Sequence, residues 1–367
     1  MQKYIPTYTD ISEWNLQEHL NTGGSRSKKI AINPKTDEEY FFKGSKITKD
    51  GGIRYPMEFW SEIVSSKIGK YLGFPVLDYN IAYRADHHKQ KVGCISKSMV
   101  VYSENRLTEG KEYLTGYDSN YNPEKDKKEY TFQFISKSLK YFELQKYIPK
   151  IIEIIVFDAI ISNSDRHQEN WGILHNFKDT YVEIDKVIED MSSNSFKKFI
   201  LKSLKFILQS KNDEEFSKSV LKNKFLKRIF LHFESEIVLH NFAPIYDSGC
   251  CLGREIDDSE IAEYLSNNDK LFSYINKGVA EIHWEGKSKK QTHFDLIELL
   301  KKEFSEDVKN CIERTLNKYN KSDIEEIITN IDRNLPEAME SYKLPDIRKK
   351  LMIKIITLRL EKLKEIK

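Results

Sequence analysis

Fold class depends above all on residues 160–174, which read IISNSDRHQENWGIL. They follow an apolar run with helical spacing, residues 148–161, and lead into a short β-prone run. The polar loop between these runs carries Asp165 and Asn170, five residues apart. In phosphoryl transfer an acidic residue orients the attacking hydroxyl, and a neutral oxygen ligand helps to hold magnesium. We therefore predict that Asp165 is a catalytic base and Asn170 a metal ligand; simple turn chemistry is the alternative.

His167 lies between these two residues. An imidazole at this position can stabilise charge on a transferred phosphoryl group or position Asp165. We predict that His167 belongs to the active site, the alternative being a structural histidine.

A second motif, APIYDSG, occupies residues 243–249 and places Asp247 directly after an apolar strand-like run. Such an aspartate can bridge a metal ion to phosphate oxygens. Magnesium takes only one or two carboxylates from a protein and completes its shell with phosphate oxygens and water. Asp247 together with Asn170 is therefore sufficient as a predicted magnesium site.

The N-terminal part of the chain offers a candidate phosphate loop. Gly23, Gly24 and Ser25 precede the first predicted strand, and paired glycines let backbone N–H groups approach phosphate oxygens. Lys43, at the end of the next predicted strand, is the candidate phosphate-binding lysine. An ordinary turn is the alternative for the glycines.

Glu62 lies on an amphipathic run after Lys43, where it can pair with the lysine and hold it over a nucleotide. Glu58, one turn earlier, is the alternative partner. Either carboxylate could instead be an exposed helix residue.

Periodicity predicts an α+β chain with a small β-rich N-terminal lobe, residues 1–130, and a mainly helical C-terminal lobe, residues 131–367. The N-terminal lobe is predicted to contain strands at 29–32 and 40–43 around a turn at 33–37, a helix at 56–72 stopped by Gly73, strands at 76–83 and 91–98, and a polar loop at 115–129. Predicted helices of the C-terminal lobe cover 148–161, 260–275, 293–304, 324–331 and 346–363, and a Lys-rich insertion lies near 184–240, centred on 191–228.

Composition narrows the function class. Of 367 residues, 39% are hydrophobic, and 59 Lys and Arg against 57 Asp and Glu leave a net charge of +2. This balance gives no electrostatic argument for binding nucleic acid or a membrane surface. No segment approaches the roughly 20 apolar residues of a membrane span, and the N-terminus has no signal-peptide pattern. The four cysteines have no C-x-x-C spacing, which favours a reducing compartment.

Taken together, these motifs resemble the HipA-like serine/threonine protein kinases, and in particular the compact CtkA-like branch. The resemblance rests on Gly23-Gly24, on residues 41–43, 61–64 and 72–73, on 165–172 and on 243–249, in that order along residues 20–255. It implies a bilobal protein-kinase or PI3K-like fold, ATP and Mg²⁺ as cofactors, and the roles proposed above for Lys43, Glu62, Asp165, Asn170 and Asp247.

The resemblance also implies an interlobe hinge at Gly93-Cys94-Ile95-Ser96, whose backbone would meet adenine. It implies a toxin or effector-type kinase in the bacterial cytoplasm that acts on serine or threonine of a protein, phosphorylates itself, and can have an antitoxin or other regulatory partner. Export without a cleaved signal is the alternative location. Asn21 occupies the place of the usual autophosphorylated serine, so self-labelling is expected at Thr22, Ser25 or Ser27; the alternative is that these hydroxyls only bond to backbone groups of the loop.

Three other functions remain open from the residues. The Asp-Arg-His-x-x-Asn order is similar to the catalytic loop of phosphoinositide-type lipid kinases, but the acidic residues after Arg254 would repel an anionic headgroup. A small-molecule phosphotransferase of the aminoglycoside type would suit an acidic pocket. A nucleotide-binding pseudokinase would not need the candidate base.

Overall fold

The computed structural model describes residues 2–366, with gaps at 19–27, 46–47, 49–51, 86–90, 102–103, 191–197, 199–200, 204, 206–208 and 210–218. The chain divides into two compact units. The first unit comprises Met1–Ser98, Pro149–His167 and Pro244–Lys367, and the second comprises Met99–Ile148 and Gln168–Ala243. These units are discontinuous along the chain, unlike the predicted lobes, and the lobe boundary near residue 130 stays a prediction.

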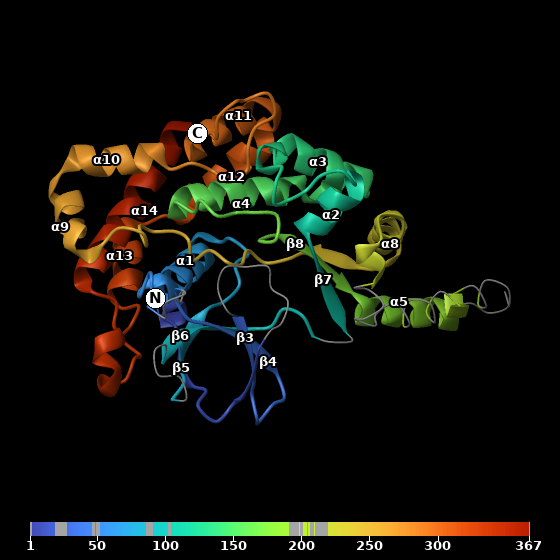
Figure 1. The fold of residues 1–367 in the computed structure, drawn as a ribbon, viewed down its shortest axis with the longest axis horizontal. Coiled ribbons are helices and arrows are strands. Elements are labelled where there is room, and N and C mark those ends of the chain that lie inside the picture. The colour runs from blue at the N-terminus through green and yellow to red at the C-terminus, as the bar shows by residue number, and fades with distance from the viewer. Residues whose placement is uncertain are drawn as a thin grey trace. The chain divides into compact units, whose positions relative to one another are not determined.

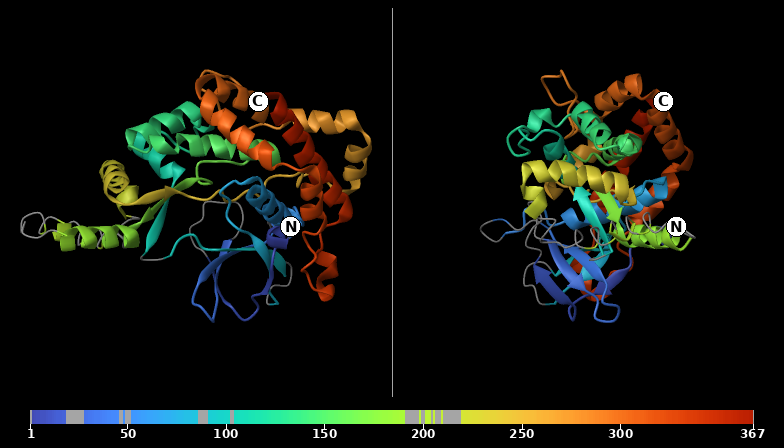
Figure 2. Two further views of the ribbon diagram at one scale, coloured as in Figure 1. Left: turned by 180° about the vertical axis from the view of Figure 1, so that it is seen from behind. Right: turned by 90° about the vertical axis from the view of Figure 1, so that its right-hand side faces the viewer.

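Six strands of the first unit form one sheet, in the order β1-β5-β6-β4-β3-β2; Figure 1 labels β3, β4, β5 and β6 of this sheet. They are β1 (Tyr8–Asp10), β2 (Asn15–Glu18), β3 (Lys28–Ile32), β4 (Glu39–Lys43), β5 (Asn80–Tyr83) and β6 (Val92–Lys97). Strands β1 and β5 are parallel, and all other neighbours are antiparallel. The sheet is curled (blue in Figure 2), and a cluster of buried side chains packs on it: Ile11, Ala31, Phe42, Ala82 and Ile95.

The predicted hairpin at residues 29–43 is confirmed as β3 and β4. The strand predicted at 76–83 is shorter than expected, because Val76 forms an isolated bridge with Ile245 and regular pairing begins only at Asn80. Strands β1 and β2 were not predicted. They have three and four residues, too few for a period of two to be recognised.

Helix α1 (Glu58–Leu72) is the predicted amphipathic helix, beginning two residues later than expected. It ends at Gly73, whose φ of 86° is the left-handed conformation that favours glycine at a helix C-terminus. All of its residues except Lys70 are buried. The indole of Trp60 also donates to the carbonyl of Tyr342, 2.9 Å away. Helix α1 is therefore enclosed by its own unit.

The remaining α-helices of the first unit lie after α1 in the chain. They are α4 (Ile148–Ile161), α9 (Asp258–Ser266), α10 (Asn268–Lys277), α11 (His293–Glu303), α12 (Ser305–Lys318), α13 (Lys321–Thr329) and α14 (Asp346–Ile366). The single helix predicted at 260–275 is two helices, because Asn267 is extended and its side chain caps α10 by accepting from the backbone of Lys270. Helix α12 was not predicted.

The second unit is built on a three-stranded antiparallel sheet, β7 (Asn105–Glu109), β8 (Gly172–Asn176) and β9 (His240–Phe242), in that order. Its helices are α2 (Gly110–Tyr117), α3 (Phe132–Tyr141), α5 (Phe177–Asp190) and α8 (Lys224–Ile237). The loop predicted at 115–129 is partly wrong, because α2 continues to Tyr117. Helices α5 and α8 flank the Lys-rich segment, most of which lies outside the described residues.

Gly110 and Trp171 are in close contact in the second unit. The N–H of Gly110 donates to the carbonyl of Trp171 at 2.9 Å, and a Cβ on Gly110 would lie 2.1 Å from the indole ring. The indole N–H donates to the hydroxyl of Tyr130, also at 2.9 Å. Only a glycine fits beneath this fixed ring.

In the part of the chain that the structure describes, no helix combines the length and the apolar character that crossing a membrane requires.

We expect Gly110→Ala to destabilise the protein by about 1–3 kcal/mol, the usual cost of overpacking a fixed core group. Gly116→Ala, in the same helix, is the matched control, because its Cβ would come closest to the end of the Leu231 side chain, at 2.7 Å, and would lie 3.2 Å from the ring of Phe142, both less severe than the contact at Gly110. Urea denaturation should give a lower midpoint for Gly110→Ala than for Gly116→Ala. Equal midpoints would contradict the packing described here.

Candidate active site

Lys43 stands at the end of β4 with 4% of its surface exposed. Its Nζ lies 3.2 Å from Oδ1 of Asp247 and 3.8 Å from Oε2 of Glu62. It also lies 3.4 Å from the hydroxyl of Tyr79. Because a buried ammonium group is stable only when it is paired, these two carboxylates hold the lysine in its charged form. The structure thus brings together three residues predicted from separate motifs.

Glu62, rather than Glu58, is the partner of Lys43. The side chain of Glu62 is fully buried, and its Oε1 accepts a 2.8 Å hydrogen bond from the backbone N–H of Ser248. Glu58 instead forms an ion pair with Arg254. Glu62 therefore connects the lysine on the sheet to the segment immediately after Asp247.

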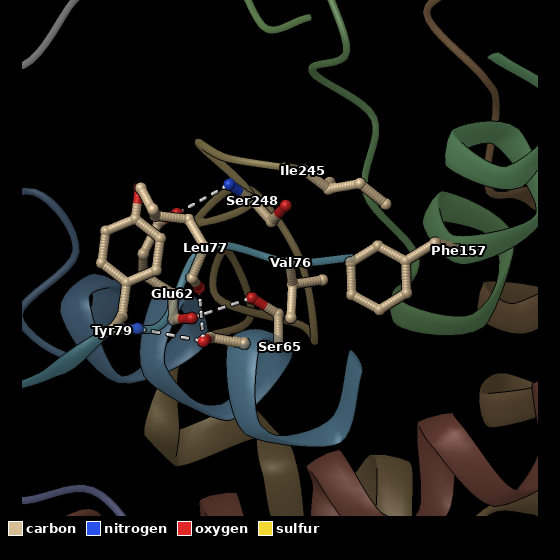
Figure 3. Close-up of a pocket in the computed structure, with 9 residues that line it drawn as sticks. Glu62, Ser65, Val76, Leu77, Tyr79, Phe157, Ile245 and Ser248 are labelled. Carbon is tan, nitrogen blue, oxygen red and sulfur yellow. Dashed lines mark hydrogen bonds between the residues drawn. The ribbon is translucent and has the colours of Figure 1, made fainter. Parts of the chain in front are cut away.

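A narrow pocket behind Glu62 shows how α1 is joined to β5 (Figure 3). The hydroxyl of Ser66 donates to the carbonyl of Leu77 at 2.7 Å and accepts from the backbone N–H of Tyr79 at 3.0 Å. Burial raises the pKa of Tyr79, so its phenol stays neutral beside the lysine. These contacts hold α1 against the segment that contains Leu77 and Tyr79, directly before β5.

Arg166 anchors the candidate catalytic loop. It is 1% exposed and forms a two-point ion pair with Asp158 of α4, at 2.9 and 2.8 Å. Its guanidinium also donates to the carbonyl of Tyr246 at 2.6 Å and to the hydroxyl of Ser248 at 3.0 Å. One side chain therefore ties the loop to a helix and to both neighbours of Asp247.

Sequence reasoning missed the roles of Asp158, Arg166 and Ser248. Asp158 was nevertheless a usable signal, because it is an acidic residue within an almost wholly apolar helix. A carboxylate in such a position must find a cation or several hydrogen bonds.

Asp165, the candidate base, is half-buried. Its backbone N–H faces the side-chain oxygen of Asn163 at 3.4 Å, and its Oδ2 accepts from the thiol of Cys250 at 2.9 Å. His167 is half-buried two residues further on. Its catalytic role stays a prediction.

Asp247 is the predicted carboxylate ligand of a divalent cation. Its φ is 56°, a left-handed conformation that aspartate tolerates better than most residues, and it is 9% exposed. Lys43 carries one positive charge between the carboxylates of Glu62 and Asp247, so this group retains a net negative charge. No cluster of three or more His, Cys, Asp and Glu side chains suited to a metal occurs among the described residues. The hard carboxylate and the excess negative charge fit magnesium that takes its other ligands from phosphate and water.

Asn170, the second predicted metal ligand, belongs to the second unit and is 3% exposed. Its flanking backbone is fixed there, because the carbonyl of Gln168 accepts from the N–H of Lys111 at 2.9 Å and that of Trp171 accepts from Gly110. Asp247 belongs to the first unit. Joint coordination of a metal by Asn170 and Asp247 stays a prediction.

The hinge assignment needs correction. Cys94, Ile95 and Ser96 lie inside β6, which is hydrogen-bonded to β4 on one side and β5 on the other. Cys94, for instance, lies opposite both Lys43 and Ile81. Because Cys94 and Ile95 are in register with both neighbouring strands, these two residues do not present a free edge to adenine, whereas Ser96 is in register with β4 alone. The other predicted nucleotide-binding residues, Gly23, Gly24 and Ser25, lie outside the described residues.

Helix α14 contacts the candidate catalytic loop through Arg359 and His293. Arg359 is fully buried; its Nη2 lies 3.0 Å from Nδ1 of His293, and Nε2 of His293 lies 2.7 Å from the carbonyl of Asn163. Nδ1 also lies 3.0 Å from the carbonyl of Gly278; because an arginine can only donate, Nδ1 is the acceptor for Arg359 and Nε2–H donates to Asn163. Burial, and secondarily the charge of Arg359, lowers the pKa of His293 to about 3, in keeping with this neutral form.

Comparison with known proteins supports the fold. No protein-family model and no curated protein matches this sequence. Among solved structures, the chain is similar to the crystal structure of a Helicobacter pylori proinflammatory kinase, CtkA, with a TM-score of 0.64. The match covers 98% of this chain and 96% of that chain at 18% sequence identity. The predicted α+β class with a kinase-like bilobal fold is confirmed. Membership of the HipA-like family stays a prediction.

We expect the stability of the protein to fall in acid because of His293. Its pKa is lowered on folding, so below about pH 6.5 the unfolded chain binds a proton that the folded chain refuses until pH falls to about 3. The free energy of unfolding should therefore decrease by up to about 1.4 kcal/mol per pH unit from this residue.

The measurement compares urea unfolding of the wild type and His293→Gln from pH 7 to pH 4. Glutamine can still donate to the carbonyl of Asn163 but does not titrate. As pH falls, the free energy of unfolding of His293→Gln should rise relative to that of the wild type. Parallel curves would show that His293 is not the acid-sensitive group.

Proposed function

We propose that this protein is an ATP- and Mg²⁺-dependent kinase that transfers the γ-phosphate to serine or threonine of a protein. The observation that carries the proposal is the position of Lys43 between Glu62 and Asp247, with Arg166 joining the loop of Asp165 to both neighbours of Asp247. A pure nucleotide-binding module would need the lysine and the acidic metal ligand but not a connected base. The kinase fold is consistent with this arrangement.

Each of these side chains has a defined task in the proposed reaction. Lys43 binds phosphate oxygens, and Glu62 keeps the lysine in position. A magnesium ion on Asp247, for which Asn170 stays the predicted second ligand, would neutralise charge on the phosphates. Asp165 orients the acceptor hydroxyl and takes its proton as the hydroxyl oxygen bonds to the γ-phosphorus and the bond to the leaving phosphate oxygen breaks.

The surface after Asp247 favours a protein substrate over an anionic lipid. Arg254 is the only nearby cation in this segment that could meet a phosphorylated headgroup, and it is paired with Glu58 and packed 4.5 Å from the ring of Tyr55. Exposed acidic residues follow, among them Glu255, Asp257 and Glu260. Such a surface attracts a basic peptide and repels a phosphoinositide.

The same acidic surface supports a second candidate, transfer to a cationic small molecule such as an aminoglycoside. Incubation of the purified chain with radiolabelled ATP and magnesium should distinguish these functions. A basic protein, a phosphoinositide vesicle and an aminoglycoside would be offered as separate acceptors. The proposal requires radiolabel in the protein acceptor. Label only in the lipid or the antibiotic would show that the substrate belongs to another class. No label in any acceptor would refute the proposal. Self-phosphorylation and a toxin role rest on the resemblance alone.

We expect Asp165→Asn and Asp247→Asn each to reduce turnover by about 10²–10³-fold, the usual loss when a positioning or charge-stabilising group is removed. Both variants should fold, which circular dichroism can check. Asp269→Asn, an exposed change in α10, is the control and should retain activity. Undiminished turnover of Asp247→Asn would remove that residue from the metal site.

We expect Lys43→Met to weaken ATP binding at least about tenfold in calorimetry, because the charge that meets the phosphates is lost while the side-chain volume is kept. Glu62→Gln should weaken binding less, since it acts only through the lysine. ATP binding and turnover at wild-type levels in Lys43→Met would show that the lysine has been assigned wrongly.

A further inference from the structure

Cys250 contacts the candidate base directly. Its Sγ lies 2.9 Å from Oδ2 of Asp165, and the thiol is the donor, since an ionised carboxylate can only accept. Cys250 follows Asp247 by three residues in the same unit and is half-buried. The thiol therefore reaches the reacting region from the segment that carries the proposed metal ligand.

The backbone on both sides of Cys250 is held in place. Arg166 binds Ser248 two residues earlier, and the N–H of Leu252, two residues later, donates to the carbonyl of Ile161 at 2.9 Å. Leu252 is fully buried with a φ of 56°, a conformation that a leucine adopts only where its surroundings impose it. The position of the Cys250 thiol thus follows from a fixed backbone.

The neighbouring cysteine serves a different purpose. The thiol of Cys251 lies 3.7 Å from the carbonyl of Ser61 in α1, and burial, followed by the charge of Glu62, raises its pKa well above the usual value. Cys94 and Cys311 are also buried. Of the four cysteines, Cys250 alone combines partial exposure with a contact to Asp165.

We infer that Cys250 is a positioning residue for Asp165, an inference that rests on the proposed function. The thiol holds Oδ2 of the carboxylate and so limits rotation of the Asp165 side chain. A thiol is a weak donor, so its contribution is modest and lies in orientation rather than in charge. The same contact places a half-buried sulfur against the base, where any group added to the sulfur would displace the carboxylate.

The first test compares Cys250→Ser and Cys250→Ala with the wild type in steady-state phosphate transfer. We expect Cys250→Ala to lower kcat about three- to tenfold without changing the KM for ATP or the melting temperature. Cys250→Ser keeps a donor and should restore most of the rate. Equal rates in all three proteins, or a serine variant as slow as the alanine variant, would overturn the inference.

The second test uses iodoacetamide. The Cys250 thiolate would displace iodide to form a thioether, with the thiol proton passing to solvent, and the wild type should then lose transfer while Cys250→Ser resists the reagent. Retention of full activity after complete alkylation of Cys250 would overturn the inference.

A third measurement does not depend on activity and so separates this inference from the proposed function. Because a carboxylate 2.9 Å away disfavours the thiolate, Asp165→Asn should be alkylated at Cys250 faster than the wild type, with Asp269→Asn as the control. Mass spectrometry measures these rates. If no phosphate transfer is found but alkylation accelerates, the contact stands and the kinase proposal fails; unchanged alkylation rates overturn the contact itself.

Discussion

The buried guanidinium of Arg166 joins the parts of the first unit that would perform chemistry. It faces both oxygens of Asp158 on α4, the carbonyl of Tyr246 and the hydroxyl of Ser248. Burial of a charge is tolerated only when it is paired and its hydrogen bonds are made, and this arrangement fulfils both conditions. Loss of Arg166 would leave Asp158 charged in an apolar helix, while loss of Asp158 would leave the arginine without its partner. The positions of Asp165 and Asp247 therefore depend on one shared side chain.

Helix α1 places a second constraint on the site. Glu62 must lie near Lys43, and in this protein that position is maintained by burial along nearly the whole helix and by the bond from Trp60 to Tyr342. An outward movement of α1 would expose side chains such as Phe59 and Ile63, which are 3% and 0% exposed, at a cost of about 25 cal/mol per Å² of apolar surface. The pairing of Glu62 with Lys43 is thus part of the core of the unit. Control of activity by displacement of this helix would require disruption of that core.

Candidate site residues could be located where one short segment holds both the residue and its context. Lys43, at the end of β4, and Asp165, after α4, are of this kind, whereas the strand-like run predicted before Asp247 forms only an isolated bridge at Ile245. The sequence favoured Glu62 over Glu58 as the partner of Lys43, but the ion pair that engages Glu58 with Arg254 could not be foreseen. The pairing of Asp158 with Arg166 depends on the path of the loop between them.

The predicted hinge position was wrong for a related reason. Strand β6 pairs on both sides because of the order of strands in the sheet, and local sequence patterns do not reveal that order. Strand β1, which was not predicted, completes the same sheet by pairing in parallel with β5. Tyr8, for example, lies opposite Ile81, about 70 residues later in the chain. Both errors concern pairings between distant segments.

The distances around Lys43 suggest how the proposed site accommodates its charges. The ammonium is closer to Asp247, at 3.2 Å, than to Glu62, at 3.8 Å. Under the proposed function, the arrival of phosphate oxygens and a divalent cation gives both Lys43 and Asp247 new partners of opposite charge. The contact between them is then exchanged, whereas Glu62 stays in place because it accepts from the backbone of Ser248. Glu62 therefore keeps its position while the Lys43 side chain can reorient. The net negative charge of Glu62, Asp247 and Lys43 together favours binding of a nucleotide with its cation over binding of the nucleotide alone.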